Sequence, residues 1–247
     1  MSVAPEEIKA CCATAYSSAA ARFLLGDSFH PGGAVLTSHL ASALRVGPGD
    51  LVVDVACGPG TSARQIARET GSDVVGIDLS PPRDPPDEPR VRFVRGDAEA
   101  LPLEDTSVDG AMCECALCTF PDKARAAAEL ARVLRPGARL ALSDMTARTC
   151  ELPESLTTLQ AWAACIADAR PLDEIAALLE QAGLTVEQTE TRDDALISLL
   201  DRIDARLKVA TLVGAEDIAR GRELAAEARA AVQRGLLGYG IVIARKR

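Results

Sequence analysis

The chain has 247 residues, 48% of them hydrophobic, and a formal net charge of −9 at pH 7. This length can bury one full core, so we expect a single α/β domain with small additions. The acidic balance argues against nucleic-acid binding, which needs a basic face to neutralise phosphates. The sequence shows no apolar run of bilayer length and no signal-peptide pattern at its start. We therefore expect a cytoplasmic protein without a membrane partner, whose eight cysteines are reduced thiols.

The N-terminal part of the sequence is expected to be helical. Residues 5–25 predict one helix that ends at Gly26, and residues 34–46 predict a second helix after a glycine-bounded loop. We expect residues 1–46 to form a helical cap. Its apolar periodicity is compatible either with covering a cofactor pocket or with packing against the edge of a sheet.

A strand, a glycine turn and a helix follow in Leu51–Thr61. The β-branched apolar run at its start is typical of a strand that is buried on both faces. Gly58 and Gly60 allow a sharp turn and a close approach to a ligand. Thr61 or Ser62 is the expected N-cap of the helix. This order of elements predicts the first unit of a nucleotide-binding α/β sheet.

Asp54 indicates which nucleotide is bound. The glycine spacing also fits a dinucleotide-binding turn, with Asp78 placed to bind a ribose. The Asp54 carboxylate would repel a pyrophosphate, whereas it would attract the ammonium and sulfonium groups of S-adenosylmethionine. The pattern Asp54-x-Ala56-x-Gly58-x-Gly60 resembles the first motif of class I S-adenosylmethionine methyltransferases, with alanine at position 56 where glycine is more usual.

Later segments are similar to the same family. The strand Asp73–Asp78 ends in an acid that can hold both ribose hydroxyls. The strand Val91–Arg95 leads into Asp97, in a segment resembling the one whose acid meets the adenine amine. The proline-rich connector before that strand, Pro81–Pro89, is expected to be extended. The resemblance implies S-adenosylmethionine as cofactor, bound by Tyr16, Asp54, Ala56, Gly58, Gly60, Thr61, Asp78, Leu79, Asp97, Ala98 and Glu114.

The remaining pattern continues the α/β alternation. Strands are expected at Val108–Glu114, Leu140–Met145, 184–190 and Gly238–Arg247, and helices at Pro121–Arg135, 153–167, 171–182, 193–213 and 215–234. The resemblance implies a Rossmann-like class I methyltransferase fold: a seven-stranded, mostly parallel sheet with helices on both faces and an antiparallel last strand. Residues 47–247 would form this domain, with a helical insertion at about 193–234.

Three cysteines in Cys113–Cys118 stand where the fourth strand ends, beside the point where open α/β sheets bind ligands. From Asp109 to Lys123, and again at Trp162-Ala-Ala-Cys165, the chain resembles arsenite methyltransferases. The resemblance implies that Cys115 and Cys165 hold trivalent arsenic, the methyl acceptor, and a related soft centre such as antimony, selenium, tellurium or mercury is the alternative within this class. Thiolates are soft ligands that suit such a centre, and its lone pair can attack a methyl group without a general base.

The source of a third thiol is open. The family places another cysteine before the first strand, where this chain has Leu24-Leu-Gly-Asp27. Candidates are Cys11, Cys12, Cys57 and Cys118, or a bound small thiol, although Cys57 and Cys150 are interpreted as structural. Acidic neighbours such as Glu114 are expected to keep thiol pKa values high until the metalloid displaces the protons. A thiol reductant such as thioredoxin or glutathione is the expected partner.

Two other functions fit parts of the pattern. In the first, the methyltransferase acts on a small organic acceptor and its cysteines are structural. In the second, the chain is a zinc-binding or metalloid-sensing module that uses Cys113, Cys115, Cys118 and Cys165. Structural zinc sites usually contain two close cysteine pairs, and only Cys115-x₂-Cys118 has that spacing.

Overall fold

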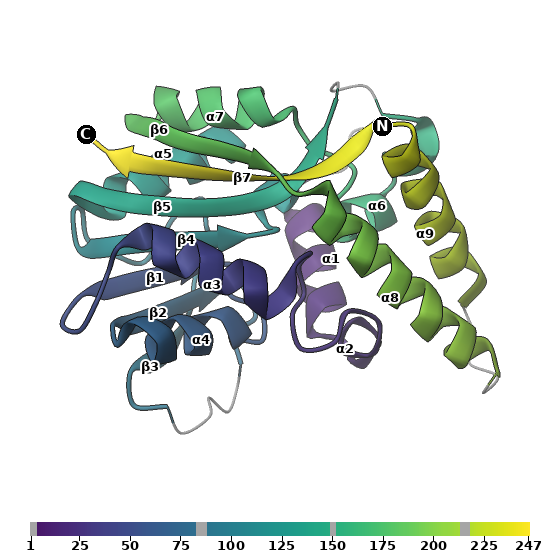
Figure 1. The fold of residues 1–247 in the computed structure, drawn as a ribbon, viewed down its shortest axis with the longest axis horizontal. Helices are drawn as coiled ribbons and strands as arrows, with labels where there is room; N and C mark the ends of the chain where they lie inside the picture. Colours follow the sequence, from purple (N-terminus) through teal and green to yellow (C-terminus); the bar gives the residue numbers. More distant parts are fainter. Residues whose placement is uncertain (1–3, 83–87, 149–151, 213–217) are drawn as a thin grey trace.

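The computed structural model describes residues 4–82, 88–148, 152–212 and 218–247. The described residues form one seven-stranded sheet of order β3-β2-β1-β4-β5-β7-β6, in which β7 runs antiparallel to both of its neighbours. Figure 1 shows the sheet with helices before and behind it. The predicted fold class is confirmed. The strands are β1 (Leu51–Val55), β2 (Asp73–Asp78), β3 (Val91–Arg95), β4 (Val108–Glu114), β5 (Leu134–Ala147), β6 (Leu184–Thr191) and β7 (Leu237–Lys246).

The two faces of the sheet carry separate apolar cores. One core contains residues of α3 (Gly33–Leu44) and α4 (Thr61–Thr70), and the other contains residues of α5 (Lys123–Val133) and α7 (Leu172–Gln181). Because β1 pairs in parallel with β2 and β4 and is covered on both faces, its sequence is a nearly continuous apolar run. Successive side chains of a strand alternate between the faces. Met112 and Cys113 of β4 therefore belong to different cores.

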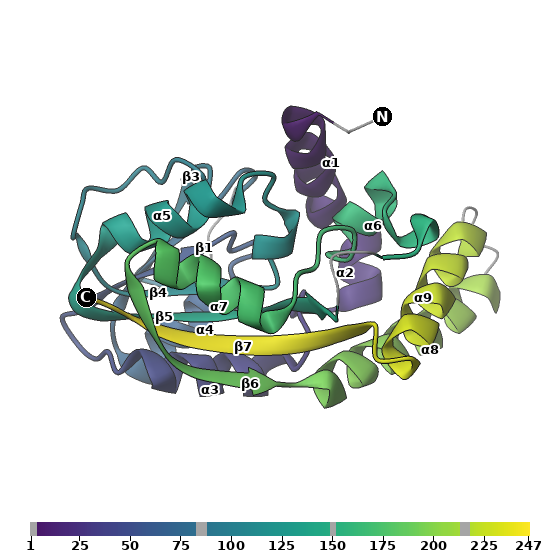
Figure 2. The same ribbon diagram turned by 90° about the horizontal axis from the view of Figure 1, so that it is seen from above.

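A second group of helices lies beyond the carboxyl ends of the central strands (Figures 1 and 2). Contacts join α1 to α6, α2 to α8, and α8 to α9, so the N-terminal helices and the helices inserted between β6 and β7 form one assembly. This assembly covers the sheet edge where parallel α/β folds bind ligands. Its members are α1 (Pro5–Ser17), α2 (Ala19–Leu25), α6 (Leu159–Ala163), α8 (Asp193–Leu212) and α9 (Ile218–Gln233).

The single helix predicted for residues 5–25 is wrong. The chain is extended at Ser18 (φ −77°, ψ 152°), where its hydroxyl accepts a hydrogen bond from the backbone N–H of Ala21 and starts α2. When the Ser18 side chain caps α2, the backbone at Ser18 takes an extended conformation, and α1 cannot continue through it. The second predicted helix of the cap corresponds to α3, which packs on the sheet, and the boundary at residue 46 stays a prediction.

Other expected boundaries are also corrected. Neither Thr61 nor Ser62 caps α4: Gly60 is the N-cap, in a left-handed conformation that suits glycine, and Thr61 is already helical. The helix predicted for 153–167 is a 3-10 turn, Glu154–Leu156, followed by the short α6. Cys150 and the centre of the proline-rich connector lie outside the described residues. No helix in the described part of the chain is long and apolar enough to cross a membrane.

Gly60 provides a test of the turn after β1. A Cβ added at Gly60 (φ +74°) would lie 2.2 Å from Cζ of Phe93, whereas one at Gly137 (φ +86°) would meet nothing within 4 Å. Gly137→Ala should therefore lose only the cost of a left-handed alanine, about 1–2 kcal/mol. Gly60→Ala should lose about 1–3 kcal/mol more through overpacking. Denaturant unfolding measures both, and equal losses would show that the Phe93 contact does not constrain the turn.

Candidate active site

A cavity lies at the carboxyl ends of β1, β2 and β4, where the strand order reverses from one side of β1 to the other. All predicted cofactor-binding residues line it except Gly60 and Ala98. Gly60 instead packs against Phe93, and Ala98 is buried in the core on the α5 face. The cavity is lined by Asp54, Ala56, Cys57, Gly58, Pro59, Thr61, Ser62, Ile77, Asp78, Leu79, Gly96, Asp97, Glu114, Cys115, Ala116, Thr119 and Phe120, and on the helical side by Lys9, Cys12, Ala13, Tyr16, Asp27, Ser28, Phe29 and His30.

Asp54 is a buried carboxyl group with one oxygen left unpaired by the described residues. Its side chain lies at the end of β1, only 2% of the residue is exposed, and Oδ2 has no hydrogen-bond partner within the described residues. Burial, together with the charges of Glu114 and Asp78, raises the pKa of Asp54 well above its usual range. Such a group is costly to ionise unless a cation meets it. The cavity therefore suits a positively charged ligand.

The turn after β1 holds Asp78 in place. The backbone N–H groups of Gly58 and Ser80 donate to the two carboxylate oxygens of Asp78, over 3.0 and 2.8 Å. Each oxygen retains a lone pair for a ligand hydroxyl. Gly58 and Ala56 both have positive φ values, 51° and 58°. The left-handed backbone at position 56 explains why glycine is the more usual residue in the motif that this segment resembles.

Two further groups at the cavity were not predicted from the sequence. His30 is 5% exposed, and its Nε2 lies 3.5 Å from Oε2 of Glu114, which also accepts a hydrogen bond from Thr37. Lys9 of α1 forms ion pairs with Asp97 and Glu99, over 2.8 and 2.6 Å. A lone histidine and one lysine on a helix carry no spacing signal, so only the fold could associate them with the cavity.

The Lys9 ion pairs fasten α1 over the cavity. Burial lowers the pKa of Lys9, but hydrogen bonds to Asp97 and Glu99 outweigh it and raise the pKa overall. The pKa of Asp97 is correspondingly low: burial would raise it, but the bond from Lys9 prevails. The remaining Asp97 oxygen accepts from the backbone of Glu99. The residue expected to meet an adenine amine is therefore also the anchor of the N-terminal helix.

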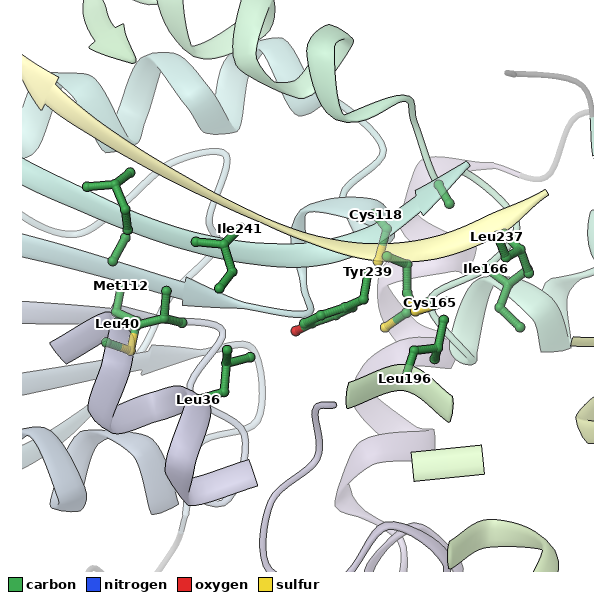
Figure 3. Close-up of a cluster of buried hydrophobic side chains, with 14 of the residues drawn as sticks. Leu36, Leu40, Met112, Cys118, Cys165, Ile166, Leu196, Leu237, Tyr239 and Ile241 are labelled. Carbon is green, nitrogen blue, oxygen red and sulfur yellow. The ribbon is translucent and has the colours of Figure 1, made fainter. Parts of the chain in front are cut away.

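Cys115, Cys118 and Cys165 lie together beside this cavity. The first two follow β4, where the Cys115 N–H donates to Ser143 O over 2.7 Å and the Cys118 N–H donates to Asp144 Oδ2 over 2.8 Å. Cys165 follows α6, and its sulfur lies 2.8 Å from Oη of Tyr16 and 3.2 Å from O of Cys115. Figure 3 shows Cys118 and Cys165 close together near Tyr239 of β7.

The three thiols differ in acidity. Hydrogen bonds from Cys115 and Cys118, together with those from Tyr16 and the charge of Lys123, hold the pKa of Cys165 well below its usual range despite burial. The pKa of Cys115 is raised by its bond to Cys165 and by burial. Burial also raises the pKa of Cys118. The expectation that acidic neighbours keep thiol pKa values high is therefore wrong for Cys165, because hydrogen bonds to its sulfur favour the ionised form.

Asp144 completes the surroundings of the thiols. It is 1% exposed, and burial and the charge of Cys165 raise its pKa to about 7. Hydrogen bonds that Asp144 accepts from Cys118 and Met145 act in the opposite direction but do not prevail. Asp144 of β5 therefore lies beside the two thiols of the loop after β4 and is itself harder to ionise than a free aspartate.

The other cysteines are placed differently. Cys113 is fully buried in the core on the opposite face of the sheet, so the four-cysteine zinc set is not brought together. Cys12 lines the cofactor cavity, and burial and the nearby Cys165 raise its pKa to about 12. Cys11 does not line the cofactor cavity, whereas Cys57 lines it from a buried position. In the part of the chain that the structure describes, no three His, Cys, Asp or Glu side chains are arranged to hold a metal ion.

A second cavity of about 330 Å³ adjoins the thiols. Tyr16, Phe29 and Cys115 line both cavities, and Cys165 lines the second. Its other walls come mainly from α2, α8 and α9, and no Asp, Glu, Lys, Arg or His occurs among its lining residues. The sequence pattern predicted the apolar stripe of α8 but not that it encloses a cavity.

Comparisons with known proteins agree with this geometry. Residues 53–142 match the family described as Methyltransferase domain. Methyltransferase GfsG of Streptomyces halstedii is 34% identical over 194 residues, which are 71% of this chain and 69% of that protein. O-methyltransferase rstn1 of Aspergillus nomiae is 33% identical over 66% of this chain and 77% of that protein. The chain belongs to the class I S-adenosylmethionine-dependent methyltransferases.

Two further similarities differ in what they show. An arsenite methyltransferase of Halobacterium salinarum is 30% identical over 60% of this chain, but the match spans only 40% of that protein. The cyclopropane synthase MmaA2 of Mycobacterium tuberculosis has a TM-score of 0.79 and 16% identity, over 100% of this chain and 99% of that structure. The second similarity supports the fold of the whole chain and not its substrate.

The buried Asp54 carboxyl group predicts that cofactor binding releases a proton. Because the pKa of Asp54 is raised, the empty site holds a proton at pH values where a free aspartate does not, and a cationic ligand displaces it. Affinity for S-adenosylmethionine should rise with pH until Asp54 is ionised. Asp54→Asn should abolish that pH dependence and weaken binding by about 1.5–3 kcal/mol. Calorimetry in buffers of different ionisation enthalpy measures the proton, and equal release by both proteins would contradict the assignment.

The Lys9 ion pairs predict a ligand-dependent lid. Lys9→Met removes both pairs, so the amides of α1 should exchange with deuterium several-fold faster, while Lys9→Arg should retain most of the protection. S-adenosylhomocysteine should slow exchange in the parent protein, because α1 lines the cofactor cavity. Hydrogen-exchange mass spectrometry that finds α1 equally protected with and without ligand would show a permanent scaffold.

Proposed function

We propose that this methyltransferase transfers a methyl group to trivalent arsenic held by its cysteine thiolates. The observation that carries the proposal is the meeting of Cys115 and Cys165, which are 50 residues apart in sequence, beside the cofactor cavity. The similarity to the Halobacterium arsenite methyltransferase supports it. Thiolates are the ligands that select soft centres, and one of these thiols is held in a readily ionised state.

The residues of the first cavity fit the cofactor of the family. Asp54 and Glu114 would face its ammonium and sulfonium groups, Asp78 would bind the ribose hydroxyls, and Asp97 would meet the adenine. S-adenosylmethionine supplies an electrophilic methyl group. Tyr16 and Cys115 line both cavities, so they lie where the donor and acceptor sites meet. The chain's contribution is to position the acceptor and to exclude water.

The chemistry needs thiols and no general base. The lone pair of arsenic forms the new As–C bond, and the pair of the broken C–S bond stays on sulfur, which yields S-adenosylhomocysteine. Arsenic thereby passes from the trivalent to the pentavalent state. Two electrons from a thiol reductant, such as thioredoxin or glutathione, return it to the trivalent state and form one disulfide. When arsenite is the acceptor, Cys118 or Cys12 is the third thiol, because both lie near Cys165.

A small organic acceptor is the second candidate. The apolar cavity beside the thiols favours it, and the related rstn1 is by its name an O-methyltransferase. Hydroxyl acceptors usually need a general base. The groups able to serve are His30 and Glu114, both of which line the cofactor cavity. Under this alternative the cysteines would be part of the core.

Serine variants separate the two candidates. Cys115→Ser and Cys165→Ser keep the size of the side chain but replace a soft ligand with a hard one, so methylation of arsenite should fall to background in each variant. The double variant should be no worse than either single one, because the ligands act as a unit. Cys11→Ser is the matched control and should keep full activity. Mass spectrometry of methylated arsenic after incubation with a thiol reductant gives the rates.

The same variants can also contradict the proposal that the cysteines bind arsenic. If Cys115→Ser and Cys165→Ser methylate arsenite as fast as the parent, or if the parent produces no methylated arsenic, the cysteines do not hold the acceptor. Binding of S-adenosylhomocysteine should survive in both variants. Its loss would instead indicate that the substitution had damaged the fold.

A further inference from the structure

We propose that His30 and Thr37 position the Glu114 carboxylate in the cofactor cavity, and that this carboxylate thereby recognises the amino-acid end of the cofactor. This inference goes beyond the proposed function, because it concerns the cofactor and holds for any methyl acceptor. The observation behind it is a buried network that connects the segment before α3, the helix itself and the end of β4. His30 and Glu114 line the cavity, whereas Thr37 contacts both without lining it.

The network holds each of its side chains by more than one contact. The Thr37 hydroxyl lies 3.1 Å from Oε1 and 3.3 Å from Oε2 of Glu114, and 3.3 Å from Nε2 of His30. That ring nitrogen is in turn 3.5 Å from Oε2 of Glu114. The other ring nitrogen, Nδ1, lies 3.0 Å from the carbonyl oxygen of Pro31. The imidazole is therefore held at both nitrogens, and the carboxylate is held at both oxygens.

The Thr37 hydroxyl is closer to this carboxylate than to the backbone of its own helix. A threonine inside a helix commonly bonds its hydroxyl to the carbonyl oxygen four residues earlier. Here the distance from Oγ1 to that oxygen, at Gly33, is 3.5 Å, whereas the distance to Oε1 of Glu114 is 3.1 Å. Thr37 is only 1% exposed. Its hydroxyl therefore joins α3 to the end of β4 and fixes the Glu114 carboxylate between them.

Burial makes the position of Glu114 important. The exposed fractions of the Glu114 and His30 side chains are 4% and 7%. A buried carboxylate is costly unless hydrogen bonds or an opposite charge satisfy it. Thr37 and His30 meet part of this requirement, but an ionised carboxylate has about four acceptor positions on its two oxygens. The remaining positions are open to a cationic ligand in the cavity that Glu114 lines.

The strand order indicates which end of the cofactor Glu114 meets. The strands run β3-β2-β1-β4, and the acids of the cavity follow the same order: Asp97 after β3, Asp78 at the end of β2, Asp54 on β1 and Glu114 at the end of β4. With the ribose at Asp78 and the adenine at Asp97, the amino-acid end of S-adenosylmethionine lies toward β1 and β4. Its ammonium group is a cation with several N–H donors, for which carboxylate oxygens are strong acceptors.

Calorimetry with a pair of ligands tests the network. S-adenosylhomocysteine carries the amino-acid group, whereas 5′-methylthioadenosine has the same nucleoside and a thioether but lacks that group. Thr37→Val removes the hydroxyl and keeps the shape of the side chain, and Thr37→Ser keeps the hydroxyl. Ser38→Ala is the matched control, because Ser38 donates from the same helix to another carboxylate, that of Glu69, over 2.8 Å, and does not line the cofactor cavity.

Thr37→Val should weaken binding of S-adenosylhomocysteine about tenfold and binding of 5′-methylthioadenosine less than about twofold. His30→Phe, which removes both ring nitrogens, should give the same split through the other half of the network. Thr37→Ser and Ser38→Ala should bind both ligands as the parent does. When Thr37→Val is added to Glu114→Ala, it should cause no further loss, because the hydroxyl acts through that carboxylate.

A purely structural role of the network would give a different pattern. Equal losses of affinity for the two ligands in Thr37→Val and His30→Phe, or no loss for either ligand, would overturn the inference. A full additional loss from Thr37→Val in the Glu114→Ala background would also overturn it. These results would leave the proposed binding of arsenic unaffected, because the Cys115 and Cys165 variants test that proposal separately.

Discussion

The hydrogen bond between Tyr16 and Cys165 joins the parts of the molecule on which the site depends. Tyr16 belongs to the N-terminal helix α1, and Cys165 belongs to the segment after α6, yet their polar atoms are 2.8 Å apart. The same sulfur contacts the loop after β4 through Cys115. Three segments distant in sequence therefore meet at one atom. Movement of α1 changes both the cover of the cofactor cavity and the donors around the thiolate.

The cofactor cavity concentrates negative charge. Asp54, Asp78 and Glu114 place like charges at the ends of neighbouring strands, and burial strengthens their repulsion. In the empty cavity this repulsion is relieved by a raised Asp54 pKa. A cationic ligand relieves it more completely. The carboxylates therefore contribute more to binding than to the stability of the fold, whereas the Lys9 ion pairs join α1 to a separate pair of carboxylates, Asp97 and Glu99.

The sequence allowed the sheet and much of the first cavity to be predicted, for a physical reason. Strand ends and glycine turns have local signatures, and parallel strands bring their carboxyl ends to one edge, so Asp54 and Asp78 could be placed together. The break at Ser18 was missed because capping by its side chain competes with a helical pattern that continues across it. Lys9 and His30 were missed because their partners are distant in the chain. The apolar cavity was missed because a helical stripe predicts burial but not the space left beside it.

The central claim is that arsenic is bound by the cysteines of the two loops. Arsenic K-edge X-ray absorption of the protein loaded with arsenite and S-adenosylhomocysteine tests it most directly, because sulfur and oxygen neighbours scatter differently. The account predicts an all-sulfur first coordination shell that loses sulfur in Cys165→Ser and is unchanged in Cys11→Ser. A first shell of oxygen atoms in the parent protein, or a sulfur shell that survives Cys165→Ser, would contradict it.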